Sequence, residues 1–309
     1  MKGIELARAF YEEYGKPMIE REFAAYADRI AVGLVGRGSE CFGFDDDVSL
    51  DHDFEPGFCI WLTEADEREF GFKLFRAYSA LPKEYKGFKL KGKSNSDFLG
   101  RGIMTIPEFY REYTGKKEGP EIISEWLYIP SHSLAEATNG EVFSDPLGEF
   151  SRIRNYIKNG MPEDIRKKKI SSCAFLMAQS GQYNYARCLS HGERGAARLA
   201  LHEFVQKSIE IVFLLNKRHM PYYKWSFRAM RDLEILGDKA YVLEGILDNP
   251  NDRSSEILND IESFCAAVII ELKKQGMTGL DDDYLERHAY SINERISDHR
   301  LRNSGIVIQ

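Results

Sequence analysis

The feature of the sequence that most constrains the fold is a change in hydrophobic pattern near Leu147. Beyond it, long segments such as ERGAARLALHEFVQKSIEIVFLLNKR (193–218) repeat apolar residues at helical spacing. Before it, RIAVGLVG (29–36) and GFCIWLT (57–63) are short apolar runs with a glycine at one end, which is typical of buried strands. The pattern predicts an α+β protein, in which a small mixed-sheet part is followed by an all-helical part.

Further elements are predicted from composition and spacing. We expect a helix from Met1 to about Asp28 and another over residues 64–81, whose acidic first turn suits the helix dipole. Short apolar segments indicate strands at EIISEWLYIP (121–130) and GEVFSDP (140–146), and a hairpin at GFKLKGKSNS (87–96). With a boundary near residue 150, the chain divides into residues 1–150 and residues 151–309.

The first two predicted strands are joined by an acidic segment, GRGSECFGFDDDVSLDHDF (36–54). In an extended chain, residues two apart point to the same face, so Asp51 and Asp53 converge while His52 points away. Paired carboxylates suit Mg²⁺, a hard cation that takes oxygen ligands from protein, water and substrate phosphates. We therefore expect Asp51 and Asp53 to be catalytic metal ligands in a phosphoryl-transfer site.

Gly38 and Ser39 lie upstream and fit a turn whose backbone N–H groups and hydroxyl hold phosphates. A strand, a Gly-Ser turn, a spacer and Asp-x-Asp entering a second strand resemble the nucleotidyltransferase superfamily, which includes DNA polymerase β and the aminoglycoside nucleotidyltransferases. In two respects the sequence departs from that pattern. His52 replaces an apolar residue, and the acids of Asp45–Asp47 could bind metal, bind a cationic acceptor or be solvated.

A closer resemblance covers essentially the whole chain. A family of uncharacterised bacterial nucleotidyltransferase-like proteins has a similar order of Gly38–Ser39–Glu40, Asp45–Asp46, Ser49 and Asp51–His52–Asp53. VFSDPLGEFSRIR (142–154) and YYKWSFRAMRDL (222–233) also resemble segments of aminoglycoside nucleotidyltransferases. The resemblance implies a catalytic domain over residues 1–150 and a helical domain over residues 151–309 that binds nucleotide and substrate.

Cations of the helical part suit the remaining phosphate oxygens of a nucleoside triphosphate. Lys224, Arg228 and Arg231 fall about one turn apart on one predicted helix face. Lys207 lies within the apolar run FVQKSIEIVFLL (204–215), where a cation needs a reason. We expect Lys207, Lys224 and Arg228 to bind phosphate, with a surface or snorkelling cation as the alternative for each.

A third acidic residue often completes the site in members of this superfamily. Glu125 is our candidate, because it lies in the middle of the strand predicted over residues 121–130. The alternative for Glu125 is an exposed position on an edge strand. Asp145 is the second candidate, and its alternative role is to open the turn or cap the helix that follows.

Composition limits the partners and the location. The chain has 309 residues and a formal net charge of −7, which argues against a nucleic-acid partner. The five cysteines are widely spaced and include no Cys-x-x-Cys pair, so we expect buried thiols in a reducing compartment. No apolar run approaches the roughly 20 residues that span a bilayer, and the N-terminus lacks the apolar core of a signal peptide. We expect a cytoplasmic protein with no membrane partner.

These observations predict a Mg²⁺-dependent nucleotidyltransferase that moves a nucleoside monophosphate from an NTP, such as ATP, to a hydroxyl-type acceptor. A small acceptor is favoured, and modification of a protein side chain is an alternative within the same chemistry. A nucleotide-binding regulatory protein on a degenerate scaffold and a helical interaction protein with an acidic loop are alternatives from other classes. The sequence has no Walker lysine, no Gly-x-Ser-x-Gly elbow and no His-Glu-x-x-His motif, which excludes those three kinds of site.

Overall fold

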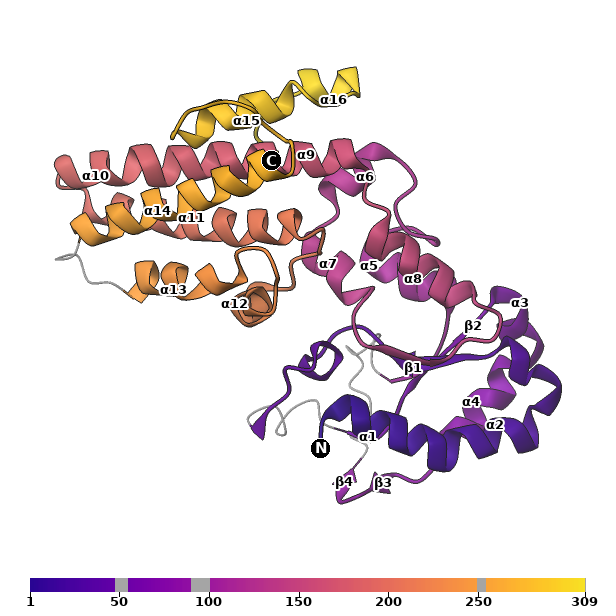
Figure 1. Cartoon of the computed structure of the whole chain (residues 1–309). Helices are drawn as coiled ribbons and strands as arrows, with labels where there is room; N and C mark the ends of the chain where they lie inside the picture. The colour runs from indigo at the N-terminus through magenta and orange to yellow at the C-terminus, as the bar shows by residue number, and fades with distance from the viewer. Residues whose placement is uncertain (48–54, 90–100, 249–253, 309) are drawn as a thin grey trace. The chain divides into compact units, whose positions relative to one another are not determined.

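The computed structural model describes residues 1–47, 55–89, 101–248 and 254–308 (Figure 1). The chain forms two compact units. The N-terminal unit comprises Met1–Ile122 and His132–Gly160, and the helical unit comprises Ile123–Ser131 and Met161–Gln309. The boundary expected near residue 150 falls at the start of a helix that belongs to the N-terminal unit. The functional roles assigned to the two parts remain predictions.

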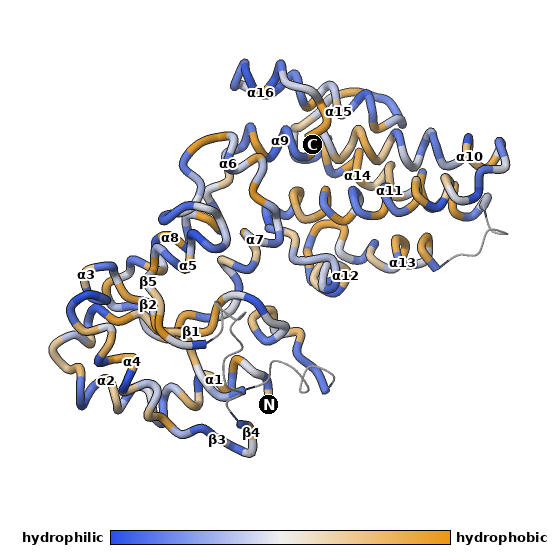
Figure 2. The backbone as a smooth tube through the Cα atoms, turned by 180° about the vertical axis from the view of Figure 1, so that it is seen from behind, coloured by the Kyte–Doolittle hydropathy of each residue, from blue (hydrophilic) through white to orange (hydrophobic). Residues whose placement is uncertain are grey.

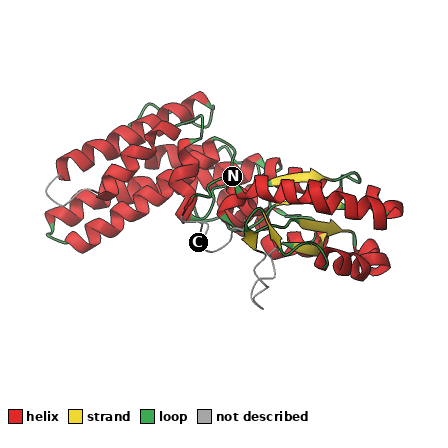
Figure 3. Ribbon diagram, turned by 90° about the horizontal axis from the view of Figure 1, so that it is seen from below, coloured by secondary structure: helices red, strands yellow, loops and turns green. Residues whose placement is uncertain are grey.

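A four-stranded mixed sheet organises the N-terminal unit, whose strands are yellow in Figure 3. The order of its strands is β5–β2–β1–β6. Its central strands, β1 (Ala31–Leu34) and β2 (Cys59–Leu62), are antiparallel, with Val32 opposite Ile60. On the outer sides, β6 (Glu141–Ser144) is antiparallel to β1, and β5 (Gly102–Thr105) is parallel to β2. The structure therefore confirms the α+β class, the small mixed sheet and the strands expected over residues 29–36, 57–63 and 140–146.

Helices and short turns surround this sheet. Their bounds are α1 (Gly3–Phe10), η1 (Tyr11–Gly15), α2 (Lys16–Glu22), η2 (Ala24–Arg29), η3 (Ser39–Phe42), α3 (Glu64–Asp66), η5 (Glu67–Gly71), α4 (Phe72–Ser79), α5 (Ile106–Thr114) and α8 (Glu149–Asn159). A two-stranded ladder pairs β3 (Glu84–Tyr85) with β4 (Phe88–Lys89). Most of the segment predicted as a hairpin, residues 90–96 of 87–96, lies outside the described residues.

Both faces of β2 are buried, because successive side chains of a strand point to opposite sides. On one face, Ile60 packs into a core that includes Leu6 and Phe10 of α1. On the other face, the Trp61 ring stacks on Phe150 of α8 at a centroid distance of 3.9 Å. Such aromatic pairs add about 1 kcal/mol beyond their buried area. The sheet is thus fixed from both sides, which sets the positions of the loops at its edges.

The strand predicted over residues 121–130 is wrong, since this segment forms helix α6 (Ile123–Tyr128). Its β-rich composition suggested a strand, but the Ile129 N–H donates to the Glu125 carbonyl, four residues earlier, at 2.9 Å. Trp126 is buried while Ile122 and Ile123 are exposed, so the segment buries one helical side and not one face of a strand. Glu125 therefore lies on a helix of the helical unit.

The helical unit is built without a described strand. Its main elements are α9 (Glu163–Met177), η6 (Ala178–Tyr185), α10 (Ala186–Ser190), α11 (Arg194–Leu215), α12 (Tyr223–Arg231), η7 (Gly237–Lys239), α13 (Ala240–Asp248), α14 (Ser254–Lys274), α15 (Leu285–Asn293) and α16 (His299–Asn303). Helix α7 (Ser131–Glu136) leads from α6 back to the sheet. Polar and apolar residues alternate along these helices (Figure 2), whose buried sides share one core that includes Met177, Phe204 and Phe264.

The fold bears on two expectations, namely that the cysteines are buried thiols and that no segment spans a membrane. Four cysteines, namely Cys41, Cys59, Cys173 and Cys265, are buried free thiols, and Cys188 is partly buried. Within the described part of the chain, no helix combines the length and the apolar character that crossing a bilayer requires.

Candidate functional site

The turn that follows β1 is held by contacts from Asn139 and Gly140, the two residues that precede β6. The Gly36 N–H donates to Asn139 Oδ1 at 2.9 Å, and Asn139 Nδ2 donates back to the Gly36 carbonyl at 2.7 Å. The Gly140 N–H donates to the Cys41 carbonyl at 2.7 Å. These bonds join residues about one hundred positions apart, so the turn has a defined place beside the start of β6.

Gly38 and Ser39 lie in this turn, as predicted, and Ser39 begins the short helix η3. Gly38 has a φ of +111°, a conformation that favours glycine. A Cβ atom at Gly38 would lie 2.4 and 2.6 Å from the two carboxylate oxygens of Glu40, so the Glu40 side chain folds back over the turn. A phosphate bound at Gly38 therefore meets a carboxylate, and it needs a cation between the two negative charges.

Glu40 belongs to a buried cluster of charges. Nη2 of Arg101 lies 3.5 Å from Glu40 Oε1, and Nη1 lies 3.5 Å from Glu55 Oε1. Nε of the same guanidinium donates to the Gly57 carbonyl at 3.2 Å. The side chains of Arg101 and Glu40 are only 8% and 7% exposed, so this attraction is weakly screened by solvent.

Two side chains behind this turn, those of Tyr113 and Glu136, are largely buried. The Tyr113 hydroxyl is buried, and a Cβ atom at Gly36 would lie 2.7 Å from it. Burial raises the pKa of Tyr113 well above its ordinary value. Burial likewise raises the pKa of Glu136, while the positive charge of Arg37, 3.9 Å away, acts in the opposite direction. Charges placed near this turn therefore act in a medium of low polarity.

The metal ligands that the sequence predicts, Asp51 and Asp53, lie outside the described residues, as does His52. Asp45, one of the unassigned acids, has a structural contact. Its Oδ2 accepts from the Gly3 N–H at 2.8 Å, at the first residue of α1, and its side chain is buried. Asp45 thus stabilises the start of this helix, whereas Asp46 and Asp47 are exposed.

The two candidates for a third acid differ in their positions. Glu125 lies on α6 and not on the sheet, so the reason for choosing it is lost. Asp145 follows β6, and its carboxylate oxygens accept from the Gly148 and Ser151 N–H groups at 3.1 and 2.7 Å. Asp145 therefore shapes the turn into α8, the alternative weighed for it. Glu141 is the only acid on the described four-stranded sheet, and it pairs with Arg8.

Lys207 on α11 has a local partner that explains a cation in an apolar helix. Its Nζ lies 2.8 Å from Glu210 Oε2, one turn along the helix. Burial lowers the pKa of Lys207, but nearby Cys173 and Glu210 outweigh this effect and raise it. By contrast, burial lowers the pKa of the neighbouring Lys169 on α9. A lysine already neutralised by Glu210 is a weaker phosphate ligand than the sequence suggested.

The predicted face of cations is present on α12. Lys224, Arg228 and Arg231 lie at helical spacing, and Lys224 is exposed beside the Trp225 ring, with Nζ 5.0 Å from the ring centroid. Arg231 pairs with Glu244 of α13. Lys224 is therefore more accessible to an anion from solution than Arg231.

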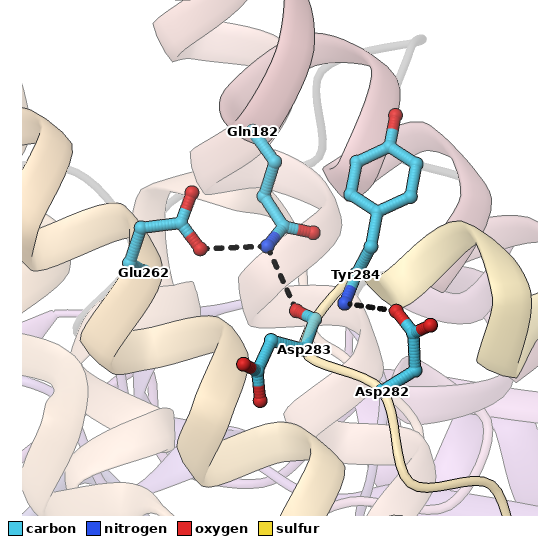
Figure 4. Close-up of a pocket in the computed structure, with 5 residues that line it drawn as sticks. All are labelled: Gln182, Glu262, Asp282, Asp283 and Tyr284. Atoms are coloured by element: carbon cyan, nitrogen blue, oxygen red, sulfur yellow. Dashed lines mark hydrogen bonds between the residues drawn. The ribbon is translucent and has the colours of Figure 1, made fainter.

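A shallow hollow of about 450 Å³ lies on the helical unit (Figure 4) and is lined by Gln182, Glu262, Asp282, Asp283 and Tyr284. The lining groups bond to one another. Gln182 Nε2 donates to Glu262 Oε2 at 2.7 Å and to the Asp283 carbonyl at 3.1 Å. Asp282 accepts from the Tyr284 N–H at 2.9 Å. These bonds account for the carboxylates of Glu262 and Asp282, and we assign no ligand to the hollow.

Sequence reasoning missed the roles of Asn139 and Arg101. The Asn139–Gly140 pair is a turn signal that could have been read, but nothing in it indicates a bond to Gly36, 103 positions away. Arg101 stands in no motif. Glu40 was noted only as part of a Gly-Ser-Glu order, without a partner.

Comparisons with known proteins add little detail. A family described as "Domain of unknown function (DUF4037)" matches residues 126–226, about a third of the chain. The chain also aligns with a nucleotidyltransferase-like protein from Exiguobacterium sibiricum 255-15, at 13% identity and a TM-score of 0.37, over 86% of this chain and 78% of that one. No curated protein matches the sequence.

Proposed function

We propose that this protein is a Mg²⁺-dependent nucleotidyltransferase whose site is formed around the turn after β1. The observation that supports it best is the local topology. A buried strand, β1, ends in a fixed Gly-Ser turn, and the acidic segment with Asp51 and Asp53 then leads into β2, the antiparallel neighbour of β1. This order places the Gly38–Ser39 turn and the entry to β2 at the same end of two paired central strands, which suits a phosphate-binding turn acting beside carboxylates that precede β2.

In the proposed reaction, an acceptor hydroxyl oxygen attacks the α-phosphorus of an NTP. The bond from that phosphorus to the α,β-bridging oxygen breaks, pyrophosphate leaves, and the hydroxyl proton passes to a base. Gly38 and Ser39 would position the β- and γ-phosphates. The phosphate-binding roles of Lys224 and Arg228, which lie in the helical unit, remain predictions from the sequence. Bound Mg²⁺ would neutralise negative charge on the phosphates. It would also offset the repulsion between the phosphates and the Glu40 carboxylate.

The proposal of a bound Mg²⁺ rests on the sequence, which places Asp51 and Asp53 two residues apart. Among the described residues, no group of three or more His, Cys, Asp or Glu side chains could hold a metal ion. Asp51 and Asp53 are outside that set. Two carboxylates with water and phosphate oxygens completing the shell fit the habits of Mg²⁺, which seldom uses an all-protein cage. The acceptor is proposed to be a small molecule with a hydroxyl group.

Pyrophosphate release tests the proposal. Purified protein is incubated with each NTP, Mg²⁺ and a panel of hydroxyl and amino-hydroxyl compounds, as wild type and as Asp51→Asn and Asp53→Asn. We expect release by the wild type and a loss of about 10³-fold in each variant, the loss expected from several kcal/mol of charge stabilisation. Asp47→Asn, an exposed acid of the same segment, is the matched control and retains activity. Equal rates in all four proteins would contradict the proposal.

A second candidate, a nucleotide-binding regulatory protein on the same scaffold, is favoured by one observation. The four strands of the sheet carry a single acid, Glu141, which is paired with Arg8, so the described sheet offers no third carboxylate. Such a protein binds Mg²⁺-NTP tightly but releases no pyrophosphate with any acceptor. Modification of a protein side chain is distinguished by transfer of label from [α-³²P]NTP to protein.

A further inference from the structure

Arg101 occupies a special place beside the acidic segment. It stands immediately before β5, and its guanidinium touches Glu40 at one end of that segment and Glu55 at the other, each at 3.5 Å. The same group donates to the Gly57 carbonyl at 3.2 Å. One buried side chain thus binds two stretches of chain that are 15 residues apart in sequence and enclose Asp51 and Asp53.

Two glycines leave the room that this arrangement needs. A Cβ atom at Gly38 would lie 2.4 Å from a carboxylate oxygen of Glu40. A Cβ atom at Gly57, where φ is +140°, would lie 2.8 Å from Cδ of Arg101. Any side chain at these positions displaces one member of the ion pair. The glycines therefore serve the Glu40–Arg101 contact in addition to the turns in which they lie.

The chemistry of the guanidinium suits this task better than that of an ammonium. Its planar fork presents five donors at fixed angles, so it can bind two carboxylates and a carbonyl at once, whereas a lysine offers one compact charge on a flexible stem. The contacts at Glu40 and Glu55 fix the two ends of the chain between them. That chain carries both carboxylates proposed to hold Mg²⁺.

We propose that Arg101 is a positioning residue, which fixes the spacing of the acidic segment by holding both of its ends. It touches neither nucleotide nor metal in this account. Its effect on metal affinity rests on the proposed function, whereas its hold on the segment does not. Outer contacts of this kind typically change metal affinity by about 10- to 100-fold.

The first test needs no nucleotide. Hydrogen exchange is measured by mass spectrometry on peptides covering residues 40–57, in wild type, Arg101→Met, Arg101→Lys and Arg152→Met. Arg152 forms an exposed pair with Glu118 in the same unit and is the matched control. We expect exchange to rise about tenfold in Arg101→Met, less in Arg101→Lys, and not at all in Arg152→Met or in α9 peptides. Wild-type exchange in Arg101→Met overturns the proposal.

The second test separates positioning from a structural role alone. The Mg²⁺ concentration that gives half-maximal NTP binding is expected to rise about tenfold or more in Arg101→Met, with partial recovery in Arg101→Lys. An unchanged Mg²⁺ dependence, beside raised exchange, overturns the positioning role. If Arg101→Met does not fold, Glu55→Gln replaces it, because it removes one contact of a partly exposed side chain and predicts a smaller change in the same direction. If the wild type binds no Mg²⁺-NTP, the proposed function fails, and exchange alone decides whether Arg101 holds the segment.

Discussion

The two units bury charged side chains for different purposes. In the N-terminal unit, Arg101, Glu40 and Glu55 converge on one turn and connect distant parts of the chain. In the helical unit, buried cations lie along α9 and bond to neighbouring helices, as Lys168 does when its Nζ donates to Asn293 Oδ1 of α15 at 2.9 Å. Buried charged side chains thus cluster at the candidate site in the N-terminal unit, whereas in the helical unit they connect neighbouring helices.

This comparison changes which cations are candidates for phosphate binding. Lys168 and Lys169 are buried, and Lys207 is paired with Glu210. These three lysines therefore make contacts inside the helical unit and are poorly placed to meet a phosphate from solution. Lys224 is exposed and lies beside an aromatic ring. Lys224 of α12 is therefore a better candidate for phosphate binding than Lys207 of α11.

The largest effect is expected on breaking the cluster of the N-terminal unit. Arg101→Met leaves the buried Glu40 carboxylate without this partner and should lower the free energy of unfolding by about 3–5 kcal/mol. Adding Glu40→Gln removes the carboxylate charge that has lost this partner and should restore more than half of that loss. Urea denaturation of the single and double variants measures both values. A double variant less stable than Arg101→Met would show that Glu40 is stabilised mainly by other contacts.

A somewhat smaller effect is expected in the helical unit. Asn293→Leu removes the side-chain acceptor of the buried Lys168 ammonium and should cost about 3 kcal/mol. Thermal unfolding measures the change, and Asn303→Leu, an exposed position on α16, should stay within about 0.5 kcal/mol of wild type. Because this contact only joins helices, Asn293→Leu should leave the Mg²⁺ dependence of NTP binding unchanged. A shift in that dependence would contradict the separation of roles.

A pH effect is expected from Lys169. Burial lowers its pKa, nearby Glu210 and Cys173 raise it, and Lys207 lowers it. The pKa of Lys169 is lower in the folded protein than in the unfolded chain. Between the folded pKa and 10.5, the unfolded chain therefore holds more protons than the folded protein, and stability rises with pH over this interval. The rise, on the order of 1 kcal/mol, should be absent in Lys169→Met. Parallel stability curves for the two proteins would refute this assignment.

The smallest effect is expected at Glu136, behind the turn. Burial raises its pKa, so the folded protein binds this proton more tightly, and stability falls as pH rises from 4.5 through the folded pKa. Glu136→Gln should remove that fall, which we expect to be less than about 1 kcal/mol because Arg37 is nearby. Urea unfolding at pH 4 and pH 7 checks this. Glu112→Gln, at an exposed partner of the same arginine, is the control and should not alter the slope.

Sequence patterns predicted the central strands because β1 and β2 are buried along their whole length and read as continuous apolar runs. They failed at α6, where β-rich composition suggested a strand, although the segment buries Trp126 and exposes Ile122 and Ile123. They also missed β5 and α5, although Thr105 and Glu108 form a capping box that marks the start of α5.

At the candidate site, the sequence located the Gly38–Ser39 turn because its residue types carry a local meaning. It could not reveal contacts whose partners are far apart. Glu40 and Arg101 are 61 positions apart, and neither residue type nor spacing indicates their approach. Lys207 shows the reverse, since its partner is three residues away and could have been read from the helix period.

The central claim is that the segment beginning at this turn binds a metal–nucleotide complex. Calorimetric titration with a non-hydrolysable ATP or GTP analogue tests it most directly, with Mg²⁺ or with EDTA, in wild type, Asp51→Asn, Asp53→Asn and the Asp47→Asn control. The account predicts binding by wild type and Asp47→Asn that requires Mg²⁺ and is weakened at least about tenfold in the other two variants. Binding of equal strength without a divalent cation, unaffected by either substitution, would contradict it.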